Sequence, residues 1–114
     1  YVVFGAGGDR DKSKRSHMAQ ILEKYANHCF ITPDNPRFEK QNHINAQIIE
    51  GFKNNKYSIY ENRNEGIEAA IKVSKKNDIV AILGKGREKF QDIRGKKIYH
   101  SDLDALKEYS CELA

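Results

Sequence analysis

Residues 1–15, YVVFGAGGDRDKSKR, give the clearest indication of the fold. A short apolar run at residues 1–4 is typical of a buried strand, and it passes directly into a loop rich in glycine and charge. Glycines allow the backbone to approach an anion closely, and cations supply charge-assisted bonds to phosphate or carboxylate. The spacing matches neither a dinucleotide fingerprint nor a P-loop. A glycine turn before a solvated helix explains the same residues, and the composition alone leaves both interpretations open.

Outward from this stretch, apolar strands alternate with amphipathic helices. The predicted strands are residues 1–4, 29–32, 57–60 and 79–83, with a late edge strand at 97–99. The predicted helices run from about 16 to 27, from Ile44 to Phe52, from Asn62 through Ile71, and from Ser101 onward with Leu103, Leu106 and Leu113. This alternation favours an α/β fold, Rossmann-like, with a mainly parallel sheet flanked by helices. We expect residues 79–83 to be the best-buried strand.

Side-chain spacing gives more detail on the helices. Two N-terminal capping signals are expected, Asn62 with Glu65 and Ser101 with Asp104. In the first helix an apolar stripe is predicted at i, i+3, i+4 and i+7: Met18, Ile21, Leu22 and Tyr25. Four aromatic side chains are predicted to pack in the core: Tyr25, Phe52, Tyr57 and Tyr60.

Composition limits the classes of function. The chain has 114 residues, 39% hydrophobic and 32% charged, which suits one soluble domain. No apolar run approaches the roughly 18 residues of a membrane span. The net charge of +4 is spread along the chain, so nucleic-acid binding has no support beyond charge. Two cysteines without CxxC spacing and four scattered histidines indicate neither zinc nor a disulfide framework, and we expect a reducing compartment and surface or loop histidines.

Three polar loops follow predicted strands, at residues 5–15, 33–38 and 84–91. Open parallel sheets bind ligands at the carboxyl ends of their strands, so these loops are the candidate site. In the second loop Pro36 fixes the backbone, and the planar fork of Arg37 suits a carboxylate. In the third loop Glu88 is suited to an ammonium group. Taken singly, each loop is equally explained as an ordinary turn.

Taken together and in this order, the three loops resemble the C-terminal domain of the Mur ligases, especially the members that add meso-diaminopimelate. The matching motifs are GGDRDKSKR at 7–15, DNPR at 34–37 and GKGRE at 84–88, and the similarity runs along nearly the whole chain. Arg87 departs from the pattern, since the family usually has histidine there. The resemblance implies that residues 1–114 are a single amino-acid-docking domain, excised from a three-domain cytoplasmic ligase.

The reaction is likewise implied by the resemblance. ATP, with Mg²⁺, phosphorylates the D-glutamate side-chain carboxylate of UDP-N-acetylmuramoyl-L-alanyl-D-glutamate, and the amine of meso-diaminopimelate attacks the acyl phosphate. Both ATP and Mg²⁺ are expected to bind mainly outside this chain. We therefore expect no catalytic residue and no metal ligand in it, and no activity from it alone.

The family motifs imply roles for particular residues. The expected carboxylate site is Arg10 and Arg37, completed by Asp34, Asn35 and Pro36, whereas Gly84 and Glu88 receive the distal ammonium and Asp9 and Lys12 lie near the nucleotide. Arg37 favours diaminopimelate over L-lysine, which has no distal carboxylate. Two alternatives remain open: a lysine-adding member of the family, and a free-standing Rossmann-like nucleotide-binding module, which would need neither residues 34–37 nor Glu88.

Overall fold

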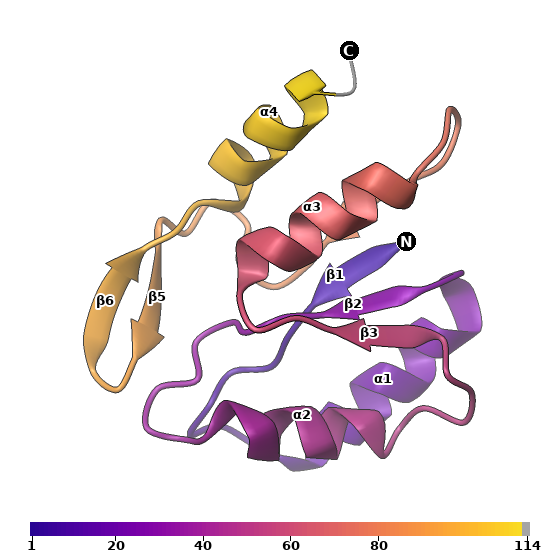
Figure 1. Ribbon diagram of the computed structural model, residues 1–114. Coiled ribbons are helices and arrows are strands. Elements are labelled where there is room, and N and C mark those ends of the chain that lie inside the picture. Colours follow the sequence, from indigo (N-terminus) through magenta and orange to yellow (C-terminus); the bar gives the residue numbers. More distant parts are fainter. Residues whose placement is uncertain (113–114) are drawn as a thin grey trace.

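A parallel sheet with helices on both faces forms the body of the molecule, and an antiparallel hairpin lies beside it (Figure 1). The structure is a computed structural model, and it describes residues 1–112. In chain order the elements are β1 Val2–Phe4, α1 Ser13–Tyr25, β2 Cys29–Ile31, α2 Gln41–Ile49, β3 Tyr57–Ile59, α3 Arg63–Val73, β4 Ala81–Ile82, β5 Phe90–Ile93, β6 Lys96–Tyr99 and α4 Asp102–Glu112. None of the helices within this range combines the length and hydrophobicity that crossing a bilayer requires.

The strand order in the sheet is β3-β2-β1-β4, and all neighbours run parallel. Val2 is paired with Cys29 on one side and with Ala81 on the other, so β1 is central. The predicted fold class, α/β with a mainly parallel sheet flanked by helices, is confirmed.

Alternating side chains divide the core into two layers. Phe4, Cys29 and Ile31 face α1 and α2, whereas Val3 and Phe30 face α3 and α4. Three of the four aromatic residues predicted in the core pack against these layers: Phe52, Tyr57 and Tyr60. Figure 1 shows the two helical layers on opposite sides of the sheet.

Both predicted helix caps are present. The Asn62 side chain accepts a hydrogen bond from the Glu65 backbone N–H at 2.8 Å, and Ser101 Oγ accepts one from the Asp104 N–H at 3.1 Å. In α4 the predicted Leu103 is 48% exposed, and Ala105 instead faces the core. The predicted Leu113 lies outside the described residues.

The stripe predicted for the first helix is partly wrong. Tyr25 is 83% exposed and Ile21 is also exposed, while Arg15 and Ala19 are the buried residues of α1. The helix also begins at Ser13, three residues before the predicted start. Arg15 is buried in an ion pair with Glu39, and a count of apolar residues does not predict a buried charge on this face of the helix.

Residues 79–83 are not the best-buried strand. Their pairing forms the two-residue β4 at the edge of the sheet, bonded to β1, and Ile79 is 80% exposed. The predicted edge strand at 97–99 is confirmed as β6, but it pairs with β5, which the sequence analysis missed. Arg94 and Gly95 form the two-residue turn between them, both at positive φ (53° and 79°), as a hairpin of this length requires.

Candidate functional site

The three predicted loops meet at the carboxyl edge of the sheet. Since β1, β2 and β4 are parallel, their C-terminal ends lie on the same side. The Gly8 N–H donates to the Asn35 carbonyl at 2.7 Å, joining the first loop to the second. The Lys85 Nζ donates to Asn35 Oδ1 at 2.9 Å, joining the third loop to the second. Asn35 is therefore the shared contact of all three loops.

Arg15 anchors the first loop from α1. It is 2% exposed, and its guanidinium donates to both carboxylate oxygens of Glu39, at 2.6 and 2.9 Å, and to the Gly7 carbonyl at 2.8 Å. The hydrogen bonds from Arg15 hold the pKa of Glu39 down at about 2. Arg15 is thus one cation of the charged loop that is unavailable to a ligand.

Asp9 also ties the first two loops together. Its backbone is left-handed (φ 54°), its N–H donates to Glu39 at 3.0 Å, and its carboxylate accepts from the Phe38 N–H at 3.2 Å. By contrast, the Lys12 side chain is 60% exposed and its Nζ lies 4.0 Å from the Glu39 carboxylate. The expected location of Asp9 and Lys12 near a nucleotide stays a prediction.

Arg37 is held in a strained conformation. Its φ of 52° is uncommon for a side chain-bearing residue. Two backbone bonds to the hairpin fix it: the Arg37 N–H donates to the Asp92 carbonyl at 2.9 Å, and the Arg94 N–H donates to the Arg37 carbonyl at 2.7 Å. Arg37 Nη1 donates to the Gly8 carbonyl at 2.9 Å. Its Nη2 and Nε make no hydrogen bond within residues 1–112, so part of the fork is available to an anion.

Arg10 and Arg37 flank the same glycine. A Cβ atom on Gly7 would lie 3.0 Å from Arg37 Nη1 and 3.5 Å from Arg10 Cγ. The Arg10 side chain is exposed and has no hydrogen bond to any described residue. Two arginine side chains that both approach Gly7 suit the binding of a carboxylate.

Acidic side chains lie beside this cationic pair. Asn35 Nδ2 donates to Glu88 Oε1 at 3.3 Å, and Lys85 Nζ lies 3.3 Å from the same oxygen. Lys85 Nζ also lies 3.1 Å from Asp34 Oδ1, in an ion pair without hydrogen-bond geometry. The bond from Asn35 and then the contact with Lys85 lower the pKa of Glu88, with a smaller contribution from the nearby positive charge of Arg37. Glu88 is therefore a carboxylate near neutral pH and is within electrostatic reach of Arg37.

The hairpin supports the second loop from behind. The buried Gln91 Nε2 donates to the Pro33 and Asp34 carbonyls at 3.1 and 2.8 Å, and the Asp92 N–H donates to Asn35 Oδ1 at 3.0 Å. None of these three hairpin contacts was foreseen in the sequence. They explain how residues of this loop, which lies outside the sheet, keep fixed positions.

Pro36 and Gly84, two of the residues predicted to contact the ligand, lie where the loops approach each other closely, and their expected ligand contacts stay predictions. Pro36 is buried, and a Cβ on Gly8 would lie 1.8 Å from its carbonyl oxygen. Gly84 has φ of 103°, a backbone conformation that favours glycine, and a Cβ there would lie 3.3 Å from Asp34 Oδ2. Both glycines therefore permit close approach between loops.

A second buried arginine, missed as a site-supporting residue, lies behind the third loop. Arg63 donates to both oxygens of Asp102 at 2.8 and 2.9 Å, to Thr32 Oγ1 at 3.1 Å and to the Leu83 carbonyl at 2.9 Å. His100 lies in the loop between β6 and α4, in line with the prediction of a surface or loop histidine, but it is buried (6% exposed) and contacts Asp102 at 2.6 Å. Burial acts to raise the pKa of Asp102, but the bonds from Arg63 and His100 outweigh it and bring the value to about 2.

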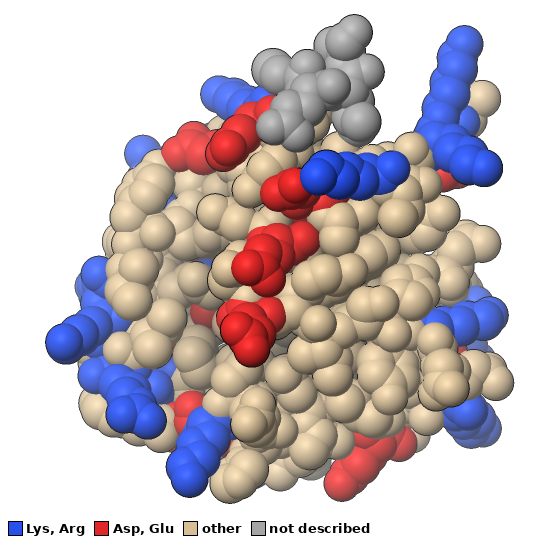
Figure 2. All heavy atoms as spheres, in the orientation of Figure 1, with Lys and Arg blue, Asp and Glu red and all other residues tan. Residues whose placement is uncertain are grey.

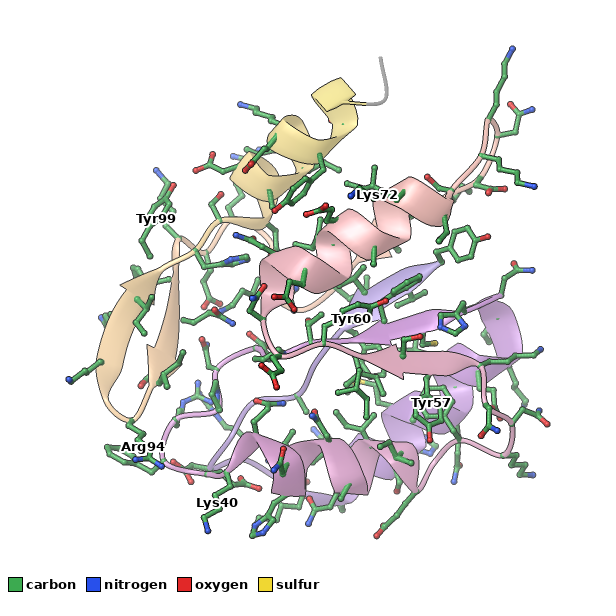
Figure 3. The ribbon with its side chains drawn as sticks, in the orientation of Figure 1. Lys40, Tyr57, Tyr60, Lys72, Arg94 and Tyr99 are labelled. Carbon is green, nitrogen blue, oxygen red and sulfur yellow. The ribbon has the colours of Figure 1, made fainter. Side chains whose placement is uncertain are left out.

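Two hollows border the site. A cavity of about 340 Å³ lies between the second loop and the hairpin turn, and its lining includes Arg37, Lys40 and Arg94. Figure 3 shows Lys40 just before α2 and Arg94 at the turn of the hairpin. A larger groove of about 710 Å³ lies between β4 and α4 and includes Arg87, but none of the residues predicted to bind ligand. The converging side chains, rather than the larger hollow, define the candidate site.

Charge elsewhere is dispersed. On the face drawn in Figure 2, lysine and arginine side chains lie mostly toward the rim, and several acidic side chains lie near the middle. On that face, basic side chains gather along the lower left rim and do not cover the middle. Within residues 1–112, no group of three or more His, Cys, Asp or Glu side chains is placed to hold a metal ion.

Comparison of the sequence with known proteins identifies the family of this chain. Residues 1–86 match the family described as "Mur ligase, glutamate ligase domain". The UDP-N-acetylmuramoyl-L-alanyl-D-glutamate--2,6-diaminopimelate ligase of Caldanaerobacter subterraneus subsp. tengcongensis is 45% identical over 113 residues, which are 97% of this chain and 23% of that protein. The ligase of the same name from Rickettsia prowazekii is 43% identical, over 99% of this chain and 24% of that protein.

A solved structure has the same fold. The structure titled "Structure of UDP-N-acetylmuramoyl-L-alanyl-D-glutamate--2, 6-diaminopimelate ligase" superposes with a TM-score of 0.90 at 33% identity, covering 99% of this chain and 24% of that one. The chain thus spans about a quarter of the length of the relatives it matches.

Proposed function

The chain belongs to the Mur ligase family, and we propose that it is the C-terminal lobe of a cytoplasmic ligase that adds meso-diaminopimelate to UDP-N-acetylmuramoyl-L-alanyl-D-glutamate in peptidoglycan synthesis. The names of the relatives described above support this substrate pair. The rest of the enzyme would lie in further domains, because the chain matches only about a quarter of each relative.

The proposed reaction joins an acid to an amine. ATP transfers a phosphoryl group to the D-glutamate side-chain carboxylate, which gives ADP and an acyl phosphate. The amine of diaminopimelate attacks the carbonyl carbon, loses a proton, and displaces phosphate through a tetrahedral intermediate. By the resemblance to the Mur ligases, ATP and Mg²⁺ are proposed to bind mainly outside this chain. The chain alone is then inactive.

One observation carries the proposal: a cation and a carboxylate lie on either side of Asn35. Asn35 O lies 3.4 Å from Arg37 Nη1, while Asn35 Nδ2 bonds Glu88 Oε1. The distal end of diaminopimelate carries a carboxylate and an ammonium on the same carbon. Arg37, with Arg10, matches the carboxylate, and Glu88 matches the ammonium. Holding that end brings the other amine to the acyl phosphate, which can lower the barrier by several kcal/mol.

Arg37 also separates the proposal from a lysine-adding relative. The distal end of L-lysine has an ammonium group but no carboxylate. With lysine in place, the free part of the Arg37 fork would face a like charge and would lose its partner. Diaminopimelate is therefore the better complement of this site.

Phosphate release by the full-length parent enzyme tests the proposal. The assay contains ATP, Mg²⁺ and UDP-N-acetylmuramoyl-L-alanyl-D-glutamate, with either meso-diaminopimelate or L-lysine. We expect turnover with diaminopimelate, little with lysine, and none from residues 1–114 alone. Turnover with lysine alone would leave the family intact and refute the specificity argument. No turnover with either amine, together with nucleotide binding by residues 1–114, would favour the free-standing nucleotide-binding module.

A further inference from the structure

Lys85 has an unusual environment for a lysine. Its side chain is 0% exposed, although it belongs to a loop whose neighbouring residues are exposed. Lysine is rarely buried unless its charge is paired. Here the Nζ lies 2.9 Å from Asn35 Oδ1, 3.0 Å from the Phe90 carbonyl, 3.1 Å from Asp34 Oδ1 and 3.3 Å from Glu88 Oε1. Three of these oxygens, on Asn35, Phe90 and Glu88, accept hydrogen bonds from the three N–H donors, so no donor is left for a ligand.

We propose that Lys85 is a positioning residue for the amino-acid site, holding Asn35 and Glu88 where they receive the ammonium group of the ligand. This inference rests on the proposed function. Lys85 lies in the loop after β4, and Asn35 lies in the loop after β2, fifty positions away in the chain. The Lys85 ammonium therefore fastens two loops that the backbone does not otherwise connect at this point.

The charges around Lys85 support this role. Asp34 and Glu88 are two carboxylates close to one ammonium, so the cluster carries one net negative charge. A single ammonium group from the ligand would balance it. Without Lys85 the two carboxylates would repel each other, and Glu88, whose side chain is 44% exposed, would be free to turn into solvent.

The loop geometry keeps Lys85 inside and its neighbours outside. Gly84 and Gly86 both have positive φ (103° and 54°), and the Glu88 N–H donates to the Lys85 carbonyl at 3.0 Å, which closes a tight turn. Arg87 and Lys89 are exposed, and their side chains make no hydrogen bond or ion pair with the described residues. Lys89 is therefore a matched control, since it carries the same charge in the same loop.

The first arm of the test needs no substrate. Hydrogen exchange of the full-length protein is compared between Lys85→Met and Lys89→Met. We expect faster exchange in residues 33–38 and 84–92 of Lys85→Met, with the remainder of the chain and the Lys89→Met protein unchanged. Unchanged exchange in both loops would overturn the inference. Should Lys85→Met fail to fold, Lys85→Gln keeps two N–H donors without the charge and serves in its place.

The second arm measures kinetics. We expect Lys85→Met to raise KM for diaminopimelate about 10- to 100-fold, while KM for ATP and for the nucleotide precursor stays within about twofold of wild type. In a Glu88→Gln background the same substitution should have a smaller effect, because Lys85 acts partly through Glu88. Equal effects on all three substrates would indicate general destabilisation, and effects that simply multiply would indicate that Lys85 acts independently of Glu88. Either result would overturn the inference.

Failure of the proposed function gives a different result. If the wild-type enzyme does not use diaminopimelate, the proposed function is wrong, and hydrogen exchange still decides whether Lys85 fastens the two loops.

Discussion

Arg15 and Arg63 are both buried, and each binds one carboxylate through two hydrogen bonds. Their partners, Glu39 and Asp102, lie 24 and 39 positions away in the chain. The sequence shows cations in charged loops, and it cannot distinguish a buried structural arginine such as Arg15 from an exposed ligand-binding one such as Arg10. That difference arises only when distant carboxylates are brought together.

Removal of Arg63 should destabilise the chain strongly. Arg63→Met leaves the Asp102 carboxylate buried without its main partner, and we expect the free energy of unfolding to fall by about 3–5 kcal/mol. Urea unfolding measures this difference. The control is Arg87→Met, at an exposed position, which should change stability by no more than about 0.5 kcal/mol. Similar midpoints for the two variants would contradict the structural role of Arg63.

Acid should weaken the fold through Glu39. Its pKa lies at about 2 in the folded chain and near 4.5 when unpaired, so its stabilising contribution is complete above pH 4.5 and is lost as the pH falls toward 2. Its side chain is 10% exposed, and the contribution is on the order of 3 kcal/mol. We expect Glu39→Gln to be less stable at pH 6 and to lose less stability on acidification. If the free energy of unfolding depended on pH in the same way in the variant and the wild type, the stabilising role of Glu39 would be refuted.

At the scale of elements, local patterns predicted the strands of the sheet and both helix caps. These local patterns failed where the place of a strand in its sheet depends on the strands beside it. The apolar run at 79–83 gives no sign that β4 lies at an edge, and β5, which alternates poorly, becomes a strand by pairing across the Arg94–Gly95 turn. Likewise, the three loops and their motifs were recognisable, but the burial of Lys85 was not, because its partners lie in other elements.

The hairpin of β5 and β6 should act as a brace for the second loop. Gln91→Met removes the bonds from Nε2 to the Pro33 and Asp34 carbonyls. We expect KM for diaminopimelate to rise about tenfold, with KM for ATP unchanged, because two buried acceptors lose their donor and the loop shifts. Steady-state kinetics of the full-length enzyme measures this. Lys96→Met, at an exposed position of β6, is the control, and equal KM values for the two variants would count against the brace.

At the scale of the whole molecule, the parallel sheet gathers the ends of β1, β2 and β4 at one edge, and the hairpin closes that edge from the side (Figure 1). Tyr99 lies on the outer side of the hairpin, away from the sheet (Figure 3). Side chains from loops far apart in sequence are thereby brought together, and this is the surface on which we propose that the amino acid docks. In the proposed enzyme this surface holds one end of an amino acid while other domains perform the phosphoryl transfer.

The ratio of kcat/KM for meso-diaminopimelate to kcat/KM for L-lysine, measured in full-length Arg37→Ala, tests the central claim most directly. We predict that kcat/KM for diaminopimelate falls about 10- to 100-fold while the value for lysine stays the same or rises, because only diaminopimelate has a distal carboxylate for Arg37 to bind. Lys40→Ala, which removes another cation lining the same cavity, should leave the ratio unchanged. Equal losses with both amines, or no loss with diaminopimelate, would contradict the claim that Arg37 binds the distal carboxylate.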